Sequence, residues 1–561
     1  MITISKVGPV WVATAPFEMK DVLKNAGMYW HPGPLACTKS GCKACRNGIL
    51  KSWWTESIDK AAELVRYADD ACRAELEIFG VKCEASLQAS TCLSADIEVP
   101  TKLPLFPFQR AGVKFIEDHG GRALVADPMG VGKSAQAIGF LVRNPAALPA
   151  LVVAPASVKV QWTREVSKFS GLSVSILSGT SSQRSFEKLG LKLFPGCPTD
   201  VVVANYDLLR RNLQLLEQHG FRTLVLDEAS AIKEPKSQRS KAAIRLSRLI
   251  PNVILLSGTP LLNRPKELWN LTQAVDPDVF PNFFHFAKRF CDAKQVQISR
   301  SGDMAWDFGG ASNLGELNTL LRKRVMVRRE KEEVLTELPE KTRVIFPIAL
   351  DKEPKDQAKR LAKLAKKKAE LDTWREKLGT LSTADRKIYL TKHAERAAEM
   401  AGMTGVLISE IQDIQKAVAF AKMPGAIERL LEMLSEGSKI LVFVHHHEVN
   451  DEVVKQLSSA GIKCVRVDGR DGPAERQKAV DAIQEGDAQV AVLGIMAAGM
   501  GLNLTAAQDV VIYELPWSPN SVDQAEARSW RHGQQGRVTT YFFVAAGTIE
   551  ESIARMLDAK R

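Results

Sequence analysis

No stretch of this 561-residue sequence stays apolar over the length of a membrane span, and its first residues lack the basic-then-apolar pattern of a secretion signal. Short internal repeats and long low-complexity segments are also missing. These absences argue against an integral membrane protein and predict a protein inside a cell, in a reducing compartment. The chain is too long for one hydrophobic core, so we expect two large domains with smaller additions.

Acidic residues are fewer than basic residues. The sequence has 65 Asp and Glu against 76 Lys and Arg, which gives a formal net charge of +11. Such an excess favours a polyanionic partner, although the signal is weak over a chain of this length. The apolar share of 45% and the charged share of 25% are those of an ordinary globular composition.

Cysteine is scarce outside the first hundred residues, which hold six of the nine. Disulfides are rare in reducing compartments, so this clustering raises the question of a metal. Cys37, Cys42 and Cys45 have the spacing of a zinc knuckle, with His31 or a distant residue such as Cys72 as fourth ligand. A second Cys-x2-Cys pair is missing, and a set of reduced, partly buried thiols is the alternative. Behind this cluster, helical spacing predicts a helix over 58–78.

The strongest pattern is the segment 126–134, which lies between a short apolar run and a helical pattern. Strand, glycine loop and helix in this order are the context of a phosphate-binding loop. Gly130 and Gly132 allow backbone N–H groups to surround phosphate oxygens, and the helix directs its positive end at the anion. Lys133 is then placed for the β- and γ-phosphates and Ser134 for Mg²⁺. A plain glycine turn between two core elements is the alternative.

Short, continuously apolar runs recur along the chain and predict strands that are buried on both faces, as in a parallel α/β sheet. The first series comprises 151–153, 201–203, 224–226 and 253–256, and the second comprises 440–444, 464–467, 490–493, 510–512 and 541–544. We therefore predict two α/β lobes, of which only the first has a phosphate loop. A helical, charged region lies between them.

Polar residues follow two of the first lobe's strands. Asp227 and Glu228 come directly after the run 224–226, where one carboxylate can hold Mg²⁺ and the other can polarise the attacking water. Ser257, Gly258 and Thr259 follow the next run and are candidates for sensing the nucleotide, with a simple polar turn as the alternative. The Asp-Glu pair is a common dipeptide, so its position after a buried strand carries the prediction.

The second lobe contains two arginines three residues apart, Arg528 and Arg531. At helical spacing both side chains lie on one face. Aimed across a cleft at a γ-phosphate, such guanidinium groups stabilise charge in the transition state. An ordinary surface helix is the alternative.

Taken together, these segments resemble the helicase-like ATPases of superfamily two, and within it the Swi/Snf type. The matching strings run in the family's order over about residues 100–555: LFPFQRAGV at 105–113, DPMGVGKS at 127–134, VAPAS at 153–157, QW at 161–162, NYD at 205–207, DEAS at 227–230, SGTP at 257–260, DG at 468–469, AGMGLNL at 498–504 and QAEARSWRHGQ at 524–534. Finer strings, GASNLGEL at 310–317, MVRR at 326–329, LPEK at 338–341 and FVHH at 443–446, are similar to the HepA-related, annealing-helicase branch.

The resemblance implies an α/β fold with two RecA-like parallel-sheet lobes, helical insertions between them and a small N-terminal α+β module. We expect the module at 1–95, lobe 1 at 96–263, the insertions and linker at 264–425, and lobe 2 at 426–561. The module looks like one found before the motor in some bacterial and phage members, although its cysteines depart from that pattern.

The family's functional residues carry over by position. The resemblance implies that ATP is bound by Gln109, at the adenine, and by Asp127, Met129, Gly130, Val131, Gly132, Lys133, Ser134 and Gln524. It assigns catalysis to Lys133, Asp227, Glu228, Arg528 and Arg531, and the coupling between nucleotide and movement to Ser257, Gly258, Thr259, Gly499 and Gly501. It assigns DNA contacts to Ser157, Gln161, Asn205, Tyr206, His445 and Asn503, and Mg²⁺ to Ser134 and Asp227. Ser230 replaces the family's usual histidine, which leaves the coupling between the lobes in doubt.

The implied activity is ATP-dependent translocation on double-stranded DNA, which remodels DNA or protein–DNA complexes. The implied cofactors are ATP and Mg²⁺, with Zn²⁺ as a candidate for the cysteine cluster. We expect duplex DNA, forked or branched forms included, as the partner, no membrane, a monomeric chain, and the cytoplasm of a bacterium or of a phage-infected host. Two alternatives stay open: a strand-separating helicase of DNA or RNA, and a non-catalytic, ATP-gated DNA clamp.

Overall fold

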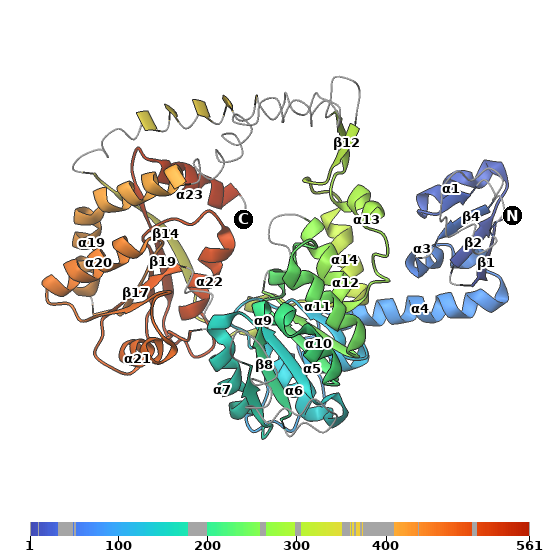
Figure 1. Cartoon of the computed structure of the whole chain (residues 1–561), viewed down its shortest axis with the longest axis horizontal. Helices are drawn as coiled ribbons and strands as arrows, with labels where there is room; N and C mark the ends of the chain where they lie inside the picture. The colour runs from blue at the N-terminus through green and yellow to red at the C-terminus, as the bar shows by residue number, and fades with distance from the viewer. Residues whose placement is uncertain are drawn as a thin grey trace.

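The computed structural model describes residues 2–8, 10–31, 49, 52–55, 57–177, 199–258, 265–297, 304–350, 409–435, 437–495 and 502–559, with isolated positions between 359 and 373. It contains a small N-terminal module, a lobe 1 in the middle of the chain and a lobe 2 formed by the C-terminal part (Figure 1). In the residues described, no helix combines the length and the apolar composition needed to cross a bilayer.

The N-terminal module is a four-stranded antiparallel sheet with helices on one side. Its strands β1 (Thr3–Val7), β2 (Val10–Thr14), β3 (Tyr29–His31) and β4 (Ser52–Thr55) lie in the order β1-β2-β4-β3, and its helices are α1 (Lys20–Asn25), α3 (Ile58–Ala62) and α4 (Asp70–Ala89). The prediction of one helix over 58–78 is wrong. Asp69 caps a new helix by accepting a hydrogen bond from the Cys72 N–H, so the chain breaks between α3 and α4.

The module is docked on lobe 1. Its long helix α4 runs towards lobe 1 (Figure 1) and packs against α14 (Leu314–Arg324). Arg324 at the end of α14 binds Asp59 of the module at 2.7 Å and Asp276 of lobe 1 at 2.9 Å. Tyr29 stacks on His285 of α13 (Phe283–Phe290), with ring centroids 4.1 Å apart.

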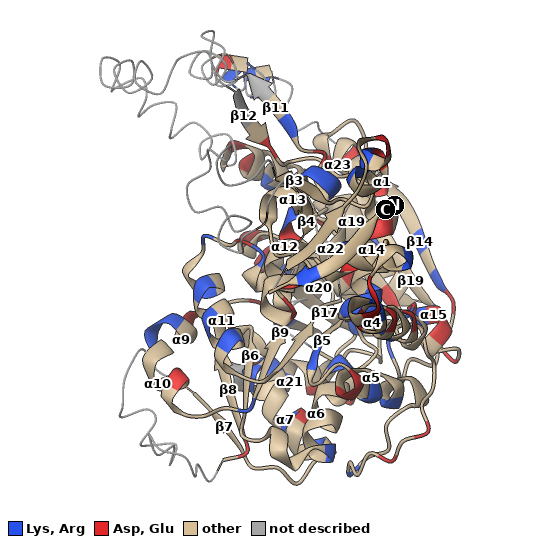
Figure 2. Ribbon diagram, turned by 90° about the vertical axis from the view of Figure 1, so that its right-hand side faces the viewer, with Lys and Arg blue, Asp and Glu red and all other residues tan. Residues whose placement is uncertain are grey.

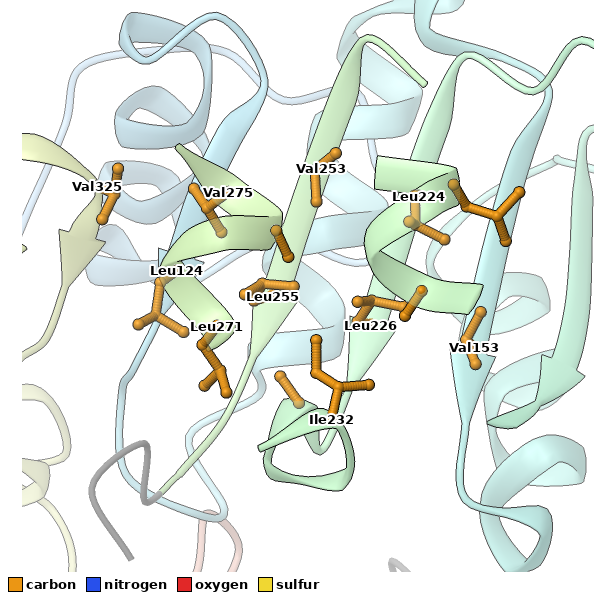
Figure 3. Packing of buried hydrophobic residues seen from close by; sticks show 14 of the residues in the cluster. Leu124, Val153, Leu224, Leu226, Ile232, Val253, Leu255, Leu271, Val275 and Val325 are labelled. Carbon is orange, nitrogen blue, oxygen red and sulfur yellow. The ribbon is translucent and has the colours of Figure 1, made fainter. Parts of the chain in front are cut away.

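Lobe 1 is built on a seven-stranded sheet in which all the pairings are parallel. Its strands are β5 (Arg122–Val125), β6 (Ala150–Ala154), β7 (Val174–Ile176), β8 (Val201–Asn205), β9 (Thr223–Asp227), β10 (Asn252–Leu256) and β13 (Met326–Val327), in the order β13-β5-β10-β9-β6-β8-β7. Its helices are α5 (Pro107–Asp118), α6 (Lys133–Arg143), α7 (Lys159–Phe169), α9 (Tyr206–Arg211), α10 (Leu213–Gln218), α11 (Gln238–Leu249) and α12 (Lys266–Val275). Figure 3 shows how Leu124, Leu226 and Leu255 of three strands pack under Leu271 of α12.

Lobe 2 is a second all-parallel sheet. Its strands are β14 (Lys341–Ile348), β15 (Ile440–Val444), β16 (Cys464–Val467), β17 (Val490–Gly494), β18 (Asp509–Ile512) and β19 (Val538–Ala545), in the order β14-β19-β18-β15-β17-β16. Its helices are α19 (Met423–Ser435), α20 (His447–Ser459), α21 (Pro473–Gln484), α22 (Pro519–Ser529) and α23 (Ile549–Ala559). The predicted fold class of two parallel-sheet α/β lobes is confirmed.

The region between the lobes contains the helices α13 and α14, together with an antiparallel hairpin of β11 (Lys294–Gln297) and β12 (Met304–Asp307). It also gives one strand to each lobe, because β13 pairs with β5 and β14 pairs with β19. The short helix α15 (Lys331–Val334) lies between these two strands. We call residues 326–341, which run from one sheet to the other, the connector.

Candidate active site

The loop between β5 and α6 turns at two glycines whose backbone is left-handed, with φ +84° at Gly130 and +83° at Gly132. A β-carbon at Gly132 would also lie 2.5 Å from Nε2 of Gln109, so neither the conformation nor the space admits a side chain there. Helix α6 begins at Lys133, and its free N–H groups face the loop. This geometry fits a bound phosphate group.

The ammonium of Lys133 is folded back over the loop. Its Nζ donates to the carbonyl oxygens of Asp127 and Pro128, each at 3.0 Å. Burial lowers the pKa of Lys133, and the Glu228 carboxylate opposes that shift most strongly. Backbone carbonyls are weaker partners for an ammonium than phosphate oxygens, so this side chain is available to an incoming anion. Ser134 follows in the first turn of α6.

Asp227 and Glu228 end strand β9 beside this loop. Three donors fix Asp227: Nε1 of Trp162 reaches one carboxylate oxygen at 2.8 Å, the Glu228 N–H reaches the other at 3.0 Å, and the Tyr206 hydroxyl reaches the backbone carbonyl at 2.7 Å. Burial, and then the neighbouring Glu228, raise the pKa of Asp227 to about 6. Glu228 itself has a left-handed φ of 47°, a strained conformation that turns its side chain off the strand direction.

Asp127, predicted to contact ATP, binds side chains within the protein. Its carboxylate is 1% exposed and forms an ion pair with Arg329, whose side chain is fully buried. Gln136 of α6 donates to the same carboxylate at 2.9 Å. The Arg329 guanidinium also donates to the Phe108 carbonyl. Asp127 therefore fixes the start of the phosphate loop to the connector.

Gln109, the predicted adenine contact, also supports the loop. Its side-chain oxygen accepts from the Phe106 N–H at 3.0 Å, and its Nε2 donates to the Val131 carbonyl at 3.0 Å. An amide has a second N–H and a second lone pair, so these bonds leave Gln109 able to bind a base as well. Met129 packs against Gly258. A β-carbon at Gly258 would lie only 2.6 Å from Cγ of Met129.

The two arginines of α22 and the turn after it face lobe 1. Arg528 is 9% exposed, and its guanidinium contacts the Gln524 and Leu502 carbonyls at 3.3 and 3.5 Å. Burial, and then Arg531, lower the pKa of Arg528 to about 10, while Glu228 and Asp227 of the other lobe oppose the shift. The backbone of the same helix approaches the phosphate loop, because the Ala527 carbonyl oxygen lies 3.8 Å from the position that a β-carbon at Gly130 would take.

Arg531 lies against the phosphate loop itself. Its β-carbon is 3.2 Å from the position that a β-carbon at Gly130 would take. The neighbouring His532 packs edge-on against Phe106, with ring centroids 4.8 Å apart. Residues from both lobes thus meet at the loop, and neither arginine faces bulk solvent.

The predicted coupling residues are described in part. Ser257 is fully buried, and its hydroxyl has no hydrogen-bond partner within the described residues. A β-carbon at Gly258 would lie 3.4 Å from Lys133 Nζ, so this turn rests on the phosphate loop. Thr259, Gly499 and Gly501 lie outside the described residues.

The predicted DNA residues fall into two groups. Ser157, His445 and Asn503 are exposed, as a DNA contact requires. The amides of Gln161 and Asn205 bind Glu165 at 2.7 Å and Lys159 at 3.4 Å. Tyr206 differs from the prediction, because it is 4% exposed and its hydroxyl is bound to Asp227. It supports the catalytic strand rather than a surface contact.

The predicted zinc ligands Cys37, Cys42 and Cys45 lie outside the described residues, and His31 is a buried residue at the end of β3. The part of the chain that the structure describes contains no group of three His, Cys, Asp or Glu residues that could hold a metal.

The sequence alone does not assign two residues that fix the site, Trp162 and Arg329. Trp162 belongs to the QW string and Arg329 to the MVRR string. Their partners lie 65 and 202 residues away along the chain. No spacing rule connects residues at such separations. The one available signal was a charged pair next to a short apolar run, at 326–329.

The fold and the site define a class: a two-lobed protein in which a phosphate loop and two carboxylates of one parallel sheet meet arginines of a second. The chain belongs to the SNF2-related family, whose domain model matches residues 108–416. The helicase conserved C-terminal domain matches residues 425–533. The predicted membership of the Swi/Snf type of superfamily two is confirmed.

Curated relatives are similar over most of this chain. A SWI/SNF-related matrix-associated actin-dependent regulator of chromatin subfamily A-like protein 1 of Xenopus tropicalis is 34% identical over 81% of this chain and 44% of that protein. A DNA annealing helicase and endonuclease of Homo sapiens is 32% identical over 81% of this chain and 40% of that protein. A solved Sulfolobus solfataricus SWI2/SNF2 ATPase core in complex with dsDNA is 24% identical over 83% of this chain and 93% of that chain, with a TM-score of 0.38. The chain spans less than half the length of these two curated relatives.

Proposed function

We propose that the protein is a DNA-dependent ATPase that couples ATP hydrolysis to movement on double-stranded DNA. The observation that carries this proposal is the meeting of both lobes at the phosphate loop, where Arg531 and the Ala527 carbonyl of lobe 2 lie 3.2 and 3.8 Å from the position of a β-carbon at Gly130. A static scaffold needs no such cleft completed from two sides. The names of the two relatives, a chromatin regulator-like protein and a DNA annealing helicase, support the same class of activity.

The residues of the cleft fit a magnesium nucleotide. Among the described residues, the hydrogen-bond partners of Lys133 Nζ are backbone carbonyls, and Ser134 and Asp227 offer the oxygen ligands that Mg²⁺ prefers. When bound, the metal neutralises developing charge on the phosphates. Glu228 orients and polarises the attacking water, and the guanidinium groups of Arg528 and Arg531 stabilise the transition state. Because the arginines belong to lobe 2, opening and closing of the lobes gates hydrolysis.

A basic surface on lobe 1 supports binding of the DNA backbone. Lys and Arg gather on α9 and α11 (Figure 2). There a cavity of about 300 Å³ is lined by Tyr206, Asp207, Arg210, Arg211, Ser237, Gln238 and Arg239. Its three arginines have no ion pair within the described residues. Phosphate contacts carry little base information, so we expect weak sequence preference and strong salt dependence.

The finer parts of the proposal concern partners and metals. We propose duplex DNA as the track, with forked or branched DNA among its substrates, and a monomeric chain as the working unit. A zinc ion held by Cys37, Cys42, Cys45 and His31 stays a prediction, which metal analysis of the purified protein tests. A cytoplasmic location in a bacterium or an infected host also stays a prediction.

The decisive experiment measures ATP hydrolysis with duplex, forked and single-stranded DNA and with RNA, in parallel with triplex displacement and strand displacement. We expect duplex and forked DNA to stimulate hydrolysis and the chain to displace a triplex strand without separating a duplex. Lys133→Ala and Glu228→Gln should abolish hydrolysis while DNA binding persists. Turnover retained by either variant contradicts the site, and efficient duplex separation favours the strand-separating alternative.

A further inference from the structure

The connector contacts the key elements of both lobes. Arg329 binds Asp127 at the start of the phosphate loop, with Nε 3.1 Å from the carboxylate. Further along, the Pro339 carbonyl accepts from Nε1 of Trp530 at 2.9 Å. Trp530 is the C-terminal cap of α22, the helix that carries Arg528. One short segment, which belongs to neither lobe's main body, therefore holds the loop and the arginine helix together.

Lys331 lies in the middle of the connector and is 5% exposed. Its Nζ donates to the Trp530 carbonyl oxygen and lies 4.1 Å from the centre of the Trp530 ring. On its other side, the same Nζ is 3.4 Å from the position that a β-carbon at Gly130 would take, and Arg531 approaches that position as well. The ammonium is thus placed between the phosphate loop and the arginine pair.

The charges around Lys331 are mostly positive. Lys133 of α6, Arg531 after α22 and Lys341 of β14 face it, and the opposing charge comes from Glu332 on its own helix. No carboxylate in the described parts of the chain forms an ion pair with it. Burial, and then Lys341 and Arg531, lower the pKa of Lys331 to about 7. A buried ammonium among cations is costly, and its hydrogen bond to the Trp530 carbonyl offsets part of that cost.

We propose that Lys331 is a positioning residue of the nucleotide cleft, whose ammonium caps the arginine helix and holds Arg528 and Arg531 over the phosphate loop. An ammonium at a helix C-terminus binds a free carbonyl and complements the helix dipole, as Lys331 does at Trp530. The proposal rests on the proposed ATPase function. Because the arginines act in the transition state, loss of Lys331 lowers kcat and leaves the binding of ATP nearly unchanged.

Lys331→Met tests this role, because methionine keeps an apolar stem but removes the charge and the donor. We expect kcat of DNA-stimulated ATP hydrolysis to fall by about tenfold or more, with KM for ATP within about threefold of wild type. The control is Lys455→Met. Lys455 lies on α20 of lobe 2, its side chain is 70% exposed, and its ammonium binds Glu452 of the same helix at 3.2 Å. This control should keep kcat within about threefold.

The pH profile gives a second readout. Lys331 works in its charged form, so kcat/KM of the wild type should fall as the pH rises through about 7, the pKa of Lys331 in the free protein. The charge acts in the transition state, so kcat should decline over the same pH range while KM changes little. Lys331→Met and Lys331→Gln should both lack the decline near 7. The wild-type profile needs no variant, so it tests the proposal even if a variant does not fold.

Three results would overturn the role of Lys331: an unchanged kcat in the folded variants, a rise in KM with kcat unchanged, or a wild-type kcat/KM that is flat through this pH range. Each of them leaves the proposed function standing if the wild type hydrolyses ATP in response to DNA. A wild type without that activity removes the proposed function itself.

Discussion

The position of each group in the cleft is set by a small number of hydrogen bonds from distant residues. Asp227 receives one carboxylate bond from Trp162 of α7 and a second from the N–H of its own successor, Glu228. The Tyr206 hydroxyl holds the backbone at the same point. These bonds orient a carboxylate whose burial otherwise disfavours its charged form. Trp162 is therefore a positioning residue for Asp227, the carboxylate that we propose as a ligand of Mg²⁺.

Trp162→Phe should move the acid side of the activity profile. The indole N–H stabilises the ionised form of Asp227, so its removal raises the pKa of Asp227 from about 6, by roughly one unit. Asp227 binds Mg²⁺ only when ionised, so activity is present above this pKa and is lost as the pH falls through it. We expect the acid limb of kcat/KM to shift upwards by that amount, measured between pH 5 and 8 at fixed magnesium.

A second tryptophan of lobe 1 provides the control for this change. Nε1 of Trp269 on α12 has no hydrogen-bond partner within the described residues, so Trp269→Phe removes an indole N–H that donates to nothing there. This variant should keep the wild-type acid limb. An identical shift in both variants would show that ring size, and not the bond to Asp227, sets the profile.

Among the elements, the core strands were predictable and the connector was not. The runs 151–153 and 440–444 are uninterrupted apolar segments, and each became a fully buried strand, because a sheet covered on both faces needs such runs. β13 has two residues, and β14 has mostly half-buried and exposed positions inside a charged region, so neither stands out. The catalytic residues lie at strand ends or loop glycines, which spacing reveals, whereas Arg329 and Lys331 depend on partners brought near by folding.

The surface of α9 and α11 makes a prediction about DNA. Combined replacement of Arg210, Arg211 and Arg239 by alanine should weaken duplex binding most at low salt. The plot of log affinity against log salt concentration has a negative slope, which should become shallower by about 0.9 for each phosphate that the protein no longer neutralises. Fluorescence anisotropy with a labelled duplex at several salt concentrations measures both quantities. Unstimulated ATP hydrolysis should stay unchanged, because within the described residues no hydrogen bond or ion pair joins the three arginines to Lys133, Asp227 or Glu228.

A variant with an equal reduction in charge separates this effect from a change in net charge. Arg73, Lys82 and Lys114 are exposed on α4 and α5, away from the cavity lined by the arginines. Alanine at these three positions should leave the salt slope nearly as it is in the wild type. Equal changes in the two triple variants would mean that the protein binds DNA through its overall charge and has no such backbone site.

For the molecule as a whole, the two lobes are held in contact at separate points along one cleft. Arg164 of α7 binds Gln477 of α21, Phe106 packs on His532, and the connector binds Trp530. The N-terminal module is attached to lobe 1, through Arg324, and Figure 1 shows it on the side away from lobe 2. Relative motion of the lobes therefore changes the catalytic site directly, which is what a nucleotide-driven motor requires.

This arrangement predicts that binding and hydrolysis of ATP can be separated at Arg528. Its guanidinium stays charged at neutral pH, because its lowered pKa is still about 10. Arg528→Ala leaves the phosphate loop of lobe 1 intact, so ATP affinity, measured with a fluorescent analogue, should stay within about threefold of wild type, while DNA-stimulated turnover falls by about 10³ or more. The control is Arg537→Ala. Arg537 is exposed, lies beyond the same helix, and donates to the Thr342 hydroxyl at 2.7 Å, so this variant should retain full turnover. If Arg528→Ala hydrolyses ATP at the wild-type rate, lobe 2 takes no part in the chemistry, and its contact with the loop serves only to hold the molecule closed.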